Sequence, residues 1–251
     1  MMRIFHSCLA GAALLAVSAF PAGAGSTQIA VAANFADASK EIAAAFKAKT
    51  GHEAVLSFGS SGQLMAQIQQ GAPFKIFLSA DEERPKTLIA EGLALGDTRF
   101  TYAIGKLVLW SRDGALVKGE ETLRANAFTK IAIANPAAAP YGVAALDVLK
   151  NLQLSDQLKS KIVMGNSIAQ TFQFIDTGNA ELGFVALAQV VANAGGSRWL
   201  VPQALYPEIR QDAVLLKTGA QDDASKAFLD FLKNPQARAI IEKFGYVSGV
   251  S

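Results

Sequence analysis

Four short segments of small and hydroxyl-bearing residues share a composition that suits anion binding. Each lies where an apolar, strand-like run gives way to a helical pattern, so each is expected to begin a helix. The first amides of a helix have no intrahelical acceptor, and the helix dipole adds roughly half a positive charge there. Converging helix N-termini would therefore bind an anion without Lys or Arg, and neither residue occurs in these segments. The segments are Ala32-Ala33-Asn34, Gly59-Ser60-Ser61-Gly62, Ala139-Pro140-Tyr141-Gly142 and Gly165-Asn166-Ser167-Ile168.

The alternative for each segment is ordinary helix capping, which is the simpler interpretation of a single Ser or Asn. The occurrence of four together favours a ligand site, and Ser60 and Ser61 offer more hydroxyls than one cap requires. Tyr141 would contribute its phenol or its amide, or would only pack between domains. Ile168 would contribute its backbone amide alone, because its side chain is expected in the core.

The sequence has few of the residue patterns that enzymatic catalysis requires. Once a leader containing His6 is removed, His52 is the only histidine, which argues against zinc chemistry and a catalytic triad. The run from Gly59 to Gly62 lacks the spacing of a nucleophile elbow, and Leu107 after Gly105-Lys106 breaks the phosphate-loop signature.

A carboxylate-dependent hydrolase remains as an alternative of a different class. It would use Asp81 or Glu82 from the run Asp81-Glu82-Glu83. Acidic residues in the first turn of a helix are more commonly surface groups that interact favourably with the helix dipole. We therefore expect a binding protein and no enzyme.

The N-terminal segment has the pattern of a secretory signal peptide. Arg3 precedes an apolar run over residues 8–20, and Pro21 and the triplet Ala22-Gly23-Ala24 follow it. The run is shorter than the roughly 20 residues that span a bilayer, so cleavage after Ala24 is predicted rather than an uncleaved anchor. The mature chain would have 251 − 24 = 227 residues and no cysteine. Packing alone must then stabilise it, without a disulfide or a thiolate metal site.

Composition predicts a globular protein. Hydrophobic residues make up 51% of the chain and charged residues 18%, and the formal charge is 23 − 21 = +2. This small basic excess is far from that of a protein that binds a phosphate backbone, so no nucleic-acid partner is expected.

Strand-like and helical patterns alternate along the chain, as is typical of an α/β fold with mainly parallel sheets. The alternation restarts after residue 130, which predicts two α/β lobes with a ligand cleft between them. Residues 100–110 and 213–217 are expected to be strands that cross between the lobes. The expected divisions are residues 1–24 for the signal peptide, 25–105 for the first part of lobe 1, 106–200 for lobe 2, and 201–251 for a crossover and helices returning to lobe 1. Strands are expected at residues 28–33, 54–58, 75–79, 130–134, 162–164 and 182–185, and helices at 37–49, 62–70, 82–91, 141–152, 168–177, 224–233 and 235–244.

An ordered set of motifs resembles the periplasmic molybdate-binding proteins of ABC importers over essentially the whole mature length. The set is Val31-Ala32-Ala33-Asn34-Phe35, Ser57-Phe58-Gly59-Ser60-Ser61-Gly62, Gly71-Ala72-Pro73, Phe77-Leu78-Ser79-Ala80-Asp81, Ala134-Asn135-Pro136, Ala139-Pro140-Tyr141-Gly142, Leu182-Gly183-Phe184-Val185 and Phe244-Gly245-Tyr246. The resemblance implies a type II periplasmic-binding-protein fold, in which two lobes close on one tetrahedral oxyanion.

Matched position by position, the resemblance implies that Asn34, Ser61, Tyr141 and Ile168 bind the oxyanion. Ser60 and Ala33 are also expected to be oxyanion-binding residues. Asn34 stands where the family often has a hydroxyl residue, and Ala33 where some relatives have another. The segment after Gly183 lacks the Tyr with which some members bind the anion.

The resemblance implies capture of molybdate, together with tungstate, in the periplasm and delivery to the membrane permease of an ABC importer. A monomer is expected, with no cofactor and no free metal cation in the site. The alternative within binding proteins is another oxyanion, such as thiosulfate, sulfate or phosphate.

Overall fold

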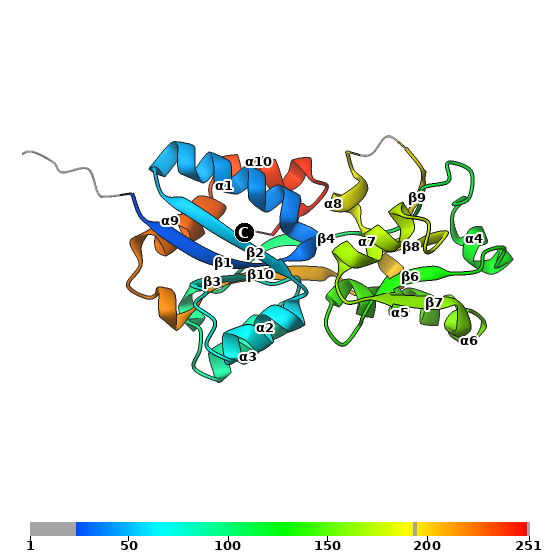
Figure 1. The fold of residues 1–251 in the computed structure, drawn as a ribbon, viewed down its shortest axis with the longest axis horizontal. Helices are drawn as coiled ribbons and strands as arrows, with labels where there is room; N and C mark the ends of the chain where they lie inside the picture. Colours follow the sequence, from blue (N-terminus) through cyan, green and yellow to red (C-terminus); the bar gives the residue numbers. More distant parts are fainter. Residues whose placement is uncertain (1–23, 193–194, 250–251) are drawn as a thin grey trace, which may run out of the picture.

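The computed structural model describes residues 24–192 and 195–249, so the expected signal peptide lies outside the described residues except for Ala24. The chain forms two lobes, each a β-sheet covered by helices, which confirms the two-lobed α/β class (Figure 1). The first sheet has the strand order β11-β4-β10-β3-β1-β2 and the second the order β7-β6-β8-β5-β9.

The strands of the first sheet are β1 (Ser26–Ala32), β2 (Glu53–Gly59), β3 (Ile76–Leu78), β4 (Phe100–Gly105), β10 (Ile209–Leu215) and β11 (Val247–Ser248), and those of the second are β5 (Leu107–Ser111), β6 (Ile131–Ala134), β7 (Ile162–Gly165), β8 (Leu182–Ala186) and β9 (Ser197–Leu200). The α-helices are α1 (Ala36–Thr50), α2 (Ser61–Gln69), α3 (Glu83–Ala90), α4 (Glu120–Ala125), α5 (Pro140–Asn151), α6 (Ser155–Leu158), α7 (Ile168–Asp176), α8 (Leu187–Val190), α9 (Asp223–Leu232) and α10 (Pro235–Lys243). Short 3-10 turns are η1 (Ala33–Phe35), η2 (Gly96–Thr98), η3 (Lys159–Lys161), η4 (Gln203–Leu205) and η5 (Lys217–Gly219).

Both sheets are mixed rather than mainly parallel, which corrects the expected pairing. Strand β1 pairs in parallel with β2 and β3, and β6 pairs in parallel with β7 and β8. The remaining pairs, which involve β4, β5, β9, β10 and β11, are antiparallel. Four of these five pairs involve β5 or β10, the strands that enter a sheet from the other lobe and run against their neighbours; the fifth joins β11 to β4.

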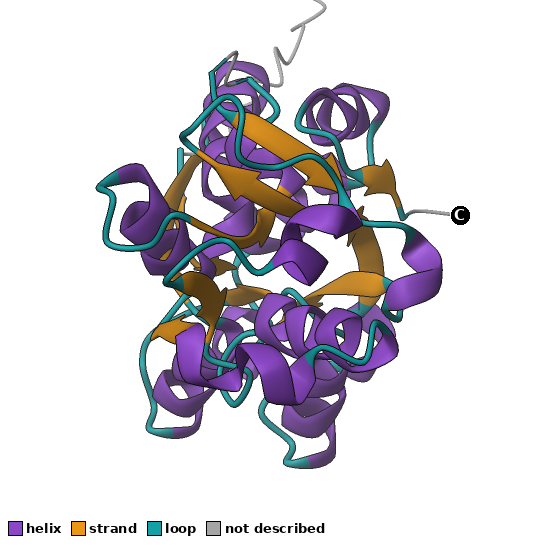
Figure 2. Cartoon of the chain, turned by 90° about the vertical axis from the view of Figure 1, so that its right-hand side faces the viewer, coloured by secondary structure: helices purple, strands orange, loops and turns teal. Residues whose placement is uncertain are grey.

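Both faces of the central strands are buried, as expected for sheets that have helices on each side. In β1, Ile29 and Val31 belong to the core under α1, α9 and α10, whereas Ala30 belongs to the core under α2 and α3. In β6, Ile131 and Ile133 pack with α5, and Ala132 packs with residues of α7. Figure 2 shows the resulting arrangement of strands between outer helices.

The chain changes lobes at two neighbouring places. Only Lys106 separates β4 from β5, so the expected strand over residues 100–110 is divided between the two sheets. The return runs through residues 201–208, before β10, and not through residues 213–217 as expected. Gly105 pairs with Ile209, which places the two crossings side by side, as in a hinge. On this basis we propose that the lobe boundaries lie after residues 105 and 200, where the sequence predicted them.

Gly142 tests how α5 is seated on the end of β6. A Cβ atom at this position would lie 2.1 Å from the carbonyl oxygen of Ala134. Because backbone cannot yield as a flexible side chain does, Gly142→Ala should destabilise the protein by at least about 2 kcal/mol, or about 4–8 °C in melting temperature. Gly114→Ala is the matched control, since nothing lies within 4 Å of its added Cβ. Equal melting temperatures for the two variants would contradict this account of the packing.

Candidate anion-binding site

The four segments identified in the sequence meet at one small cavity between the lobes. Its volume is about 10 Å³, measured as the space open to the centre of a water-sized sphere. The structure brings together all six expected residues and adds Ala80, which follows β3 and was not expected. The lining residues are Ala32, Ala33, Asn34, Ser60, Ser61, Ala80, Ala139, Pro140, Tyr141 and Ile168.

Parallel strands explain why these segments converge. Strands β1 and β2 end at η1 and α2 in the first lobe, and β6 and β7 end at α5 and α7 in the second. The carboxyl ends of parallel neighbours lie at the same edge of a sheet, and the helices that follow begin there. The two edges face each other, so the helix N-termini of both lobes point at one space.

Ser60 and Ser61 have different roles. The Ser60 hydroxyl accepts a hydrogen bond from the Gln63 amide at 3.4 Å, and Gln63 Oε1 accepts one from the Ser60 amide at 3.3 Å, which is a capping box. Ser61 is 1% exposed, and its Oγ accepts a hydrogen bond from the Ala80 amide at 2.9 Å. That bond uses a lone pair and leaves the Ser61 hydroxyl proton to donate to a ligand. Capping therefore accounts for Ser60 but not for Ser61.

Tyr141 and Ile168 place backbone amides at helix starts. Pro140 occupies the first position of α5 and has no N–H, so the Tyr141 amide is the first donor of that helix. Ile168 is the first residue of α7, and its side chain is 3% exposed, as expected for a core residue. The Tyr141 phenol oxygen accepts a hydrogen bond from Gln211 Nε2 at 3.3 Å, so the phenol is engaged away from the helix start.

The side chain of Asn34 is also engaged within the protein. Its Nδ2 donates to Gln211 Oε1 at 2.8 Å and to the Tyr246 hydroxyl at 3.1 Å, which uses both amide protons. The Tyr246 hydroxyl donates to the Asn34 carbonyl oxygen at 2.7 Å. Asn34 can therefore donate to the cavity only through its backbone amide, which lies in η1.

A buried polar network thus lies behind the cavity. The Tyr102 hydroxyl joins it, 3.1 Å from both Gln211 Oε1 and the Ser79 carbonyl oxygen. Burial raises the pKa of Tyr102, Tyr141 and Tyr246, so these phenols stay protonated at neutral pH. Gln211 was not predicted as a functional residue. The feature that could have indicated it is a polar side chain within a strand that is largely buried.

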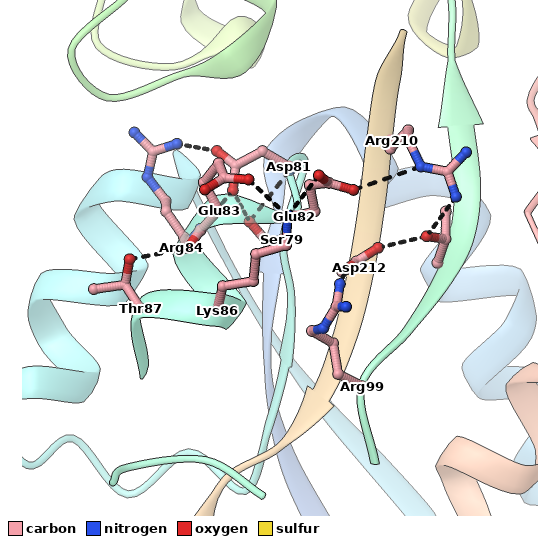
Figure 3. A network of polar contacts seen from close by, with 11 residues as sticks. Ser79, Asp81, Glu82, Glu83, Arg84, Lys86, Thr87, Arg99, Arg210 and Asp212 are labelled. Atoms are coloured by element: carbon pink, nitrogen blue, oxygen red, sulfur yellow. Dashed lines mark hydrogen bonds and ion pairs between the residues drawn. The ribbon is translucent and has the colours of Figure 1, made fainter. Parts of the chain in front are cut away.

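The carboxylates considered for hydrolysis are held in ion pairs outside the cavity, as Figure 3 shows. Asp81 pairs with Arg84 and accepts its backbone amide at 3.0 Å in the first turn of α3. Glu82 lies 2.6 Å from Lys86, whose hydrogen bond lowers the pKa of that carboxyl. A general acid needs a raised pKa, so Glu82 does not fit that role.

Charged and metal-binding groups are absent from the cavity. None of the residues that line it is charged. Across residues 24–192 and 195–249, no cluster of His, Cys, Asp or Glu could hold a metal ion. His52 accepts a hydrogen bond from the Gly25 amide at 2.9 Å and stacks on Phe46, so its role is structural.

Besides the hydrogen bond from Gln211 to Tyr141, two hydrogen bonds join the lobes beside the cavity. The Gly62 amide of α2 donates to the Ala138 carbonyl oxygen at 2.9 Å, and Arg84 Nη2 donates to the Ala137 carbonyl oxygen at 3.2 Å. Both acceptors lie in the loop that leads into α5. The structure is therefore a closed one, because the first lobe contacts the second through this loop beside the cavity.

Comparisons with known proteins agree with this geometry. The family model of bacterial extracellular solute-binding proteins matches residues 27–247. The molybdate-binding protein ModA of Rhodobacter capsulatus is 53% identical over 99% of this chain and 100% of its own length, and that of Azotobacter vinelandii is 50% identical over 94% of each. The solved periplasmic molybdate-binding protein of A. vinelandii superposes with a TM-score of 0.85 at 44% identity, covering 88% of this chain and 98% of its own.

These relatives are solute-binding proteins, a class with a transport function and no enzymatic one. Within the part of the chain that the structure describes, no helix combines the length and apolar character needed to cross a membrane. The full-length similarity, the two-lobed fold and the cavity between the lobes lead to one assignment. The chain belongs to the family of bacterial extracellular solute-binding proteins.

Proposed function

We propose that the protein captures molybdate, and also tungstate, between its lobes and delivers it to the permease of an ABC importer. The observation that carries the proposal is the convergence of neutral donors from both lobes on one small cavity. The names of the full-length relatives supply the ligand. We further propose that residues 1–24 are a cleaved signal peptide and that the mature protein acts as a periplasmic monomer.

Neutral donors suit a carrier that must release its cargo. A buried Lys or Arg would balance the dianion, but it would be left as an unpaired buried charge each time the site emptied. Helix N-termini avoid that cost, because their dipoles are fixed parts of the fold. The Ser61 hydroxyl and the amides at Asn34, Tyr141 and Ile168 are the donors that we assign to the anion.

Selectivity against sulfate would arise from cavity size. Molybdate, tungstate and sulfate are all tetrahedral dianions, but sulfate is the smallest. Donors fixed at the correct distance for the larger anions leave gaps around sulfate and forfeit charge-assisted hydrogen bonds worth about 1.5–3 kcal/mol each. Loss of two such bonds would separate the affinities by at least about a hundredfold.

Ligand-dependent stabilisation tests the proposed ligand. For purified protein stripped of bound anion, molybdate or tungstate at about 1,000 times the dissociation constant should add about 4 kcal/mol. The melting temperature should then rise by about 8–16 °C, as differential scanning calorimetry would show. Sulfate and phosphate at the same concentrations should have little effect. An equal response to sulfate would refute size selection and favour the alternative of a sulfate carrier.

Ser61→Ala tests the donor assigned to α2. The variant loses one hydrogen bond to a charged ligand, so the molybdate affinity measured by titration calorimetry should fall by about 10–100-fold. The Ala80 amide also loses its acceptor, which should cost about 1–3 kcal/mol of ligand-free stability. Ser39→Ala is the matched control, because Ser39 is fully buried and donates to the Ala36 carbonyl oxygen outside the cavity. Unchanged molybdate affinity in Ser61→Ala would reduce Ser61 to a structural role.

Closure of the cleft is tested by solution scattering. Because the cavity takes donors from both lobes, molybdate should make the stripped wild-type protein slightly more compact. Sulfate at the same concentration serves as the control and should leave the radius of gyration unchanged. Tight molybdate binding without compaction would show that the lobes do not close around the anion.

A further inference from the structure

Gln211 forms hydrogen bonds with cavity-lining segments of both lobes, through Asn34 in the first and Tyr141 in the second. It is fully buried in β10 of the first lobe and does not line the cavity. Its Oε1 accepts from Asn34 Nδ2 at 2.8 Å, within the first lobe. Its Nε2 donates to the Tyr141 hydroxyl at 3.3 Å, in α5 of the second lobe. One side-chain amide thus links two segments that carry cavity amides.

The Tyr141 phenol and the Gln211 side-chain amide both lie close against Gly105. A Cβ atom on Gly105, at the crossing between β4 and β5, would lie 2.1 Å from the Tyr141 hydroxyl and 2.6 Å from Gln211 Nε2. The Tyr141 phenol therefore lies directly against the hinge. Its position is fixed by packing on Gly105 as well as by the hydrogen bond to Gln211.

The acceptor oxygen of Gln211 has a second neighbour within the first lobe. The Tyr102 hydroxyl lies 3.1 Å from Gln211 Oε1 and from the Ser79 carbonyl oxygen. Tyr246 donates to the Asn34 carbonyl oxygen, so the η1 turn is held through both its backbone and its side chain. A buried hydrogen-bond network resists displacement, because breaking one of its bonds leaves a buried polar group without a partner.

We propose that Gln211 is a positioning residue that sets the separation between the cavity amides of the two lobes, and through it the discrimination between molybdate and smaller oxyanions. The inference rests on the proposed function and adds a residue that does not touch the anion. Gln211 holds the Asn34 turn on one side and Tyr141 on the other when the lobes are closed. Binding constellations lose selectivity when the groups that support them allow displacements approaching 1 Å.

Gln211→Leu tests this role, because leucine fills a similar volume and removes both the donor and the acceptor. Titration calorimetry with molybdate, and competition titration with sulfate, should show about a tenfold or larger loss of molybdate affinity. Sulfate affinity should change much less, because its bonds to the cavity are already long. The ratio of the two affinities should therefore fall by about tenfold.

Thr27→Val is the matched control. Thr27 and Ser225 form a buried hydroxyl pair 2.7 Å apart in the first lobe, and neither residue lines the cavity. This variant should lower the melting temperature but keep both affinities within about twofold of wild type, since it leaves the cavity groups in place. A purely structural role for Gln211 would give the same result as Thr27→Val, namely lost stability with an unchanged affinity ratio. That outcome would overturn the proposal.

Tyr141→Phe provides a second measurement if Gln211→Leu does not fold. It removes only the phenol oxygen, keeps the Tyr141 backbone amide, and breaks the link from Gln211 to the second lobe. The affinity ratio should again fall, and an unchanged ratio would refute the link.

Molybdate titration of the wild-type protein distinguishes failure of the proposed function from failure of the positioning role of Gln211. Absence of molybdate binding there refutes the proposed function and the positioning role together, whereas normal binding with insensitive variants refutes only the role of Gln211.

Discussion

The proposed function depends on one electrostatic constraint, that a doubly charged anion would be bound by groups that carry no formal charge. Helix N-termini meet this constraint only when several of them point at the same place, because each supplies a fraction of a charge. Strands β1, β2, β6 and β7 bring the starts of η1, α2, α5 and α7 to one cavity. The two mixed sheets therefore hold these helix starts facing each other across the cavity.

Formal charges are placed outside the cavity and are paired there. Asp81 with Arg84, and Glu82 with Lys86 and Arg210, lie along the start of α3 and the neighbouring strand (Figure 3). Arg84 also donates to the Ala137 carbonyl oxygen of the second lobe. The charged residues thus contribute to contact between the lobes, while the cavity keeps only dipoles. An anion in the cavity would therefore meet no carboxylate among the lining residues, which avoids electrostatic repulsion.

The sequence predicted the helix starts because capping residues, glycines and strand-to-helix transitions are local signals. All six expected residues line the cavity, and their roles toward an anion remain a prediction. Ala80 and the network of Gln211, Tyr102 and Tyr246 were missed, because they meet the site only through tertiary pairing. The strand over residues 100–110 was expected as one element and is divided at Lys106. The crossing between lobes was expected at this place, but the continuous apolar pattern does not show that it forms two separate strands, one in each sheet.

If the anion is bound by backbone amides, as we propose, side-chain identity is a weak guide to this site. An amide at the start of a helix donates whichever residue carries it, provided that the residue is not proline. Asn34 and Ile168 therefore direct their side chains to other tasks: Asn34 donates to Gln211 and Tyr246, and Ile168 packs in the core. The residues that determine the geometry are then those that fix the helix starts from behind. One of them is Gln211, which lies against Gly105 at the hinge, where a small change in angle between the lobes would change the separation of the opposing amides.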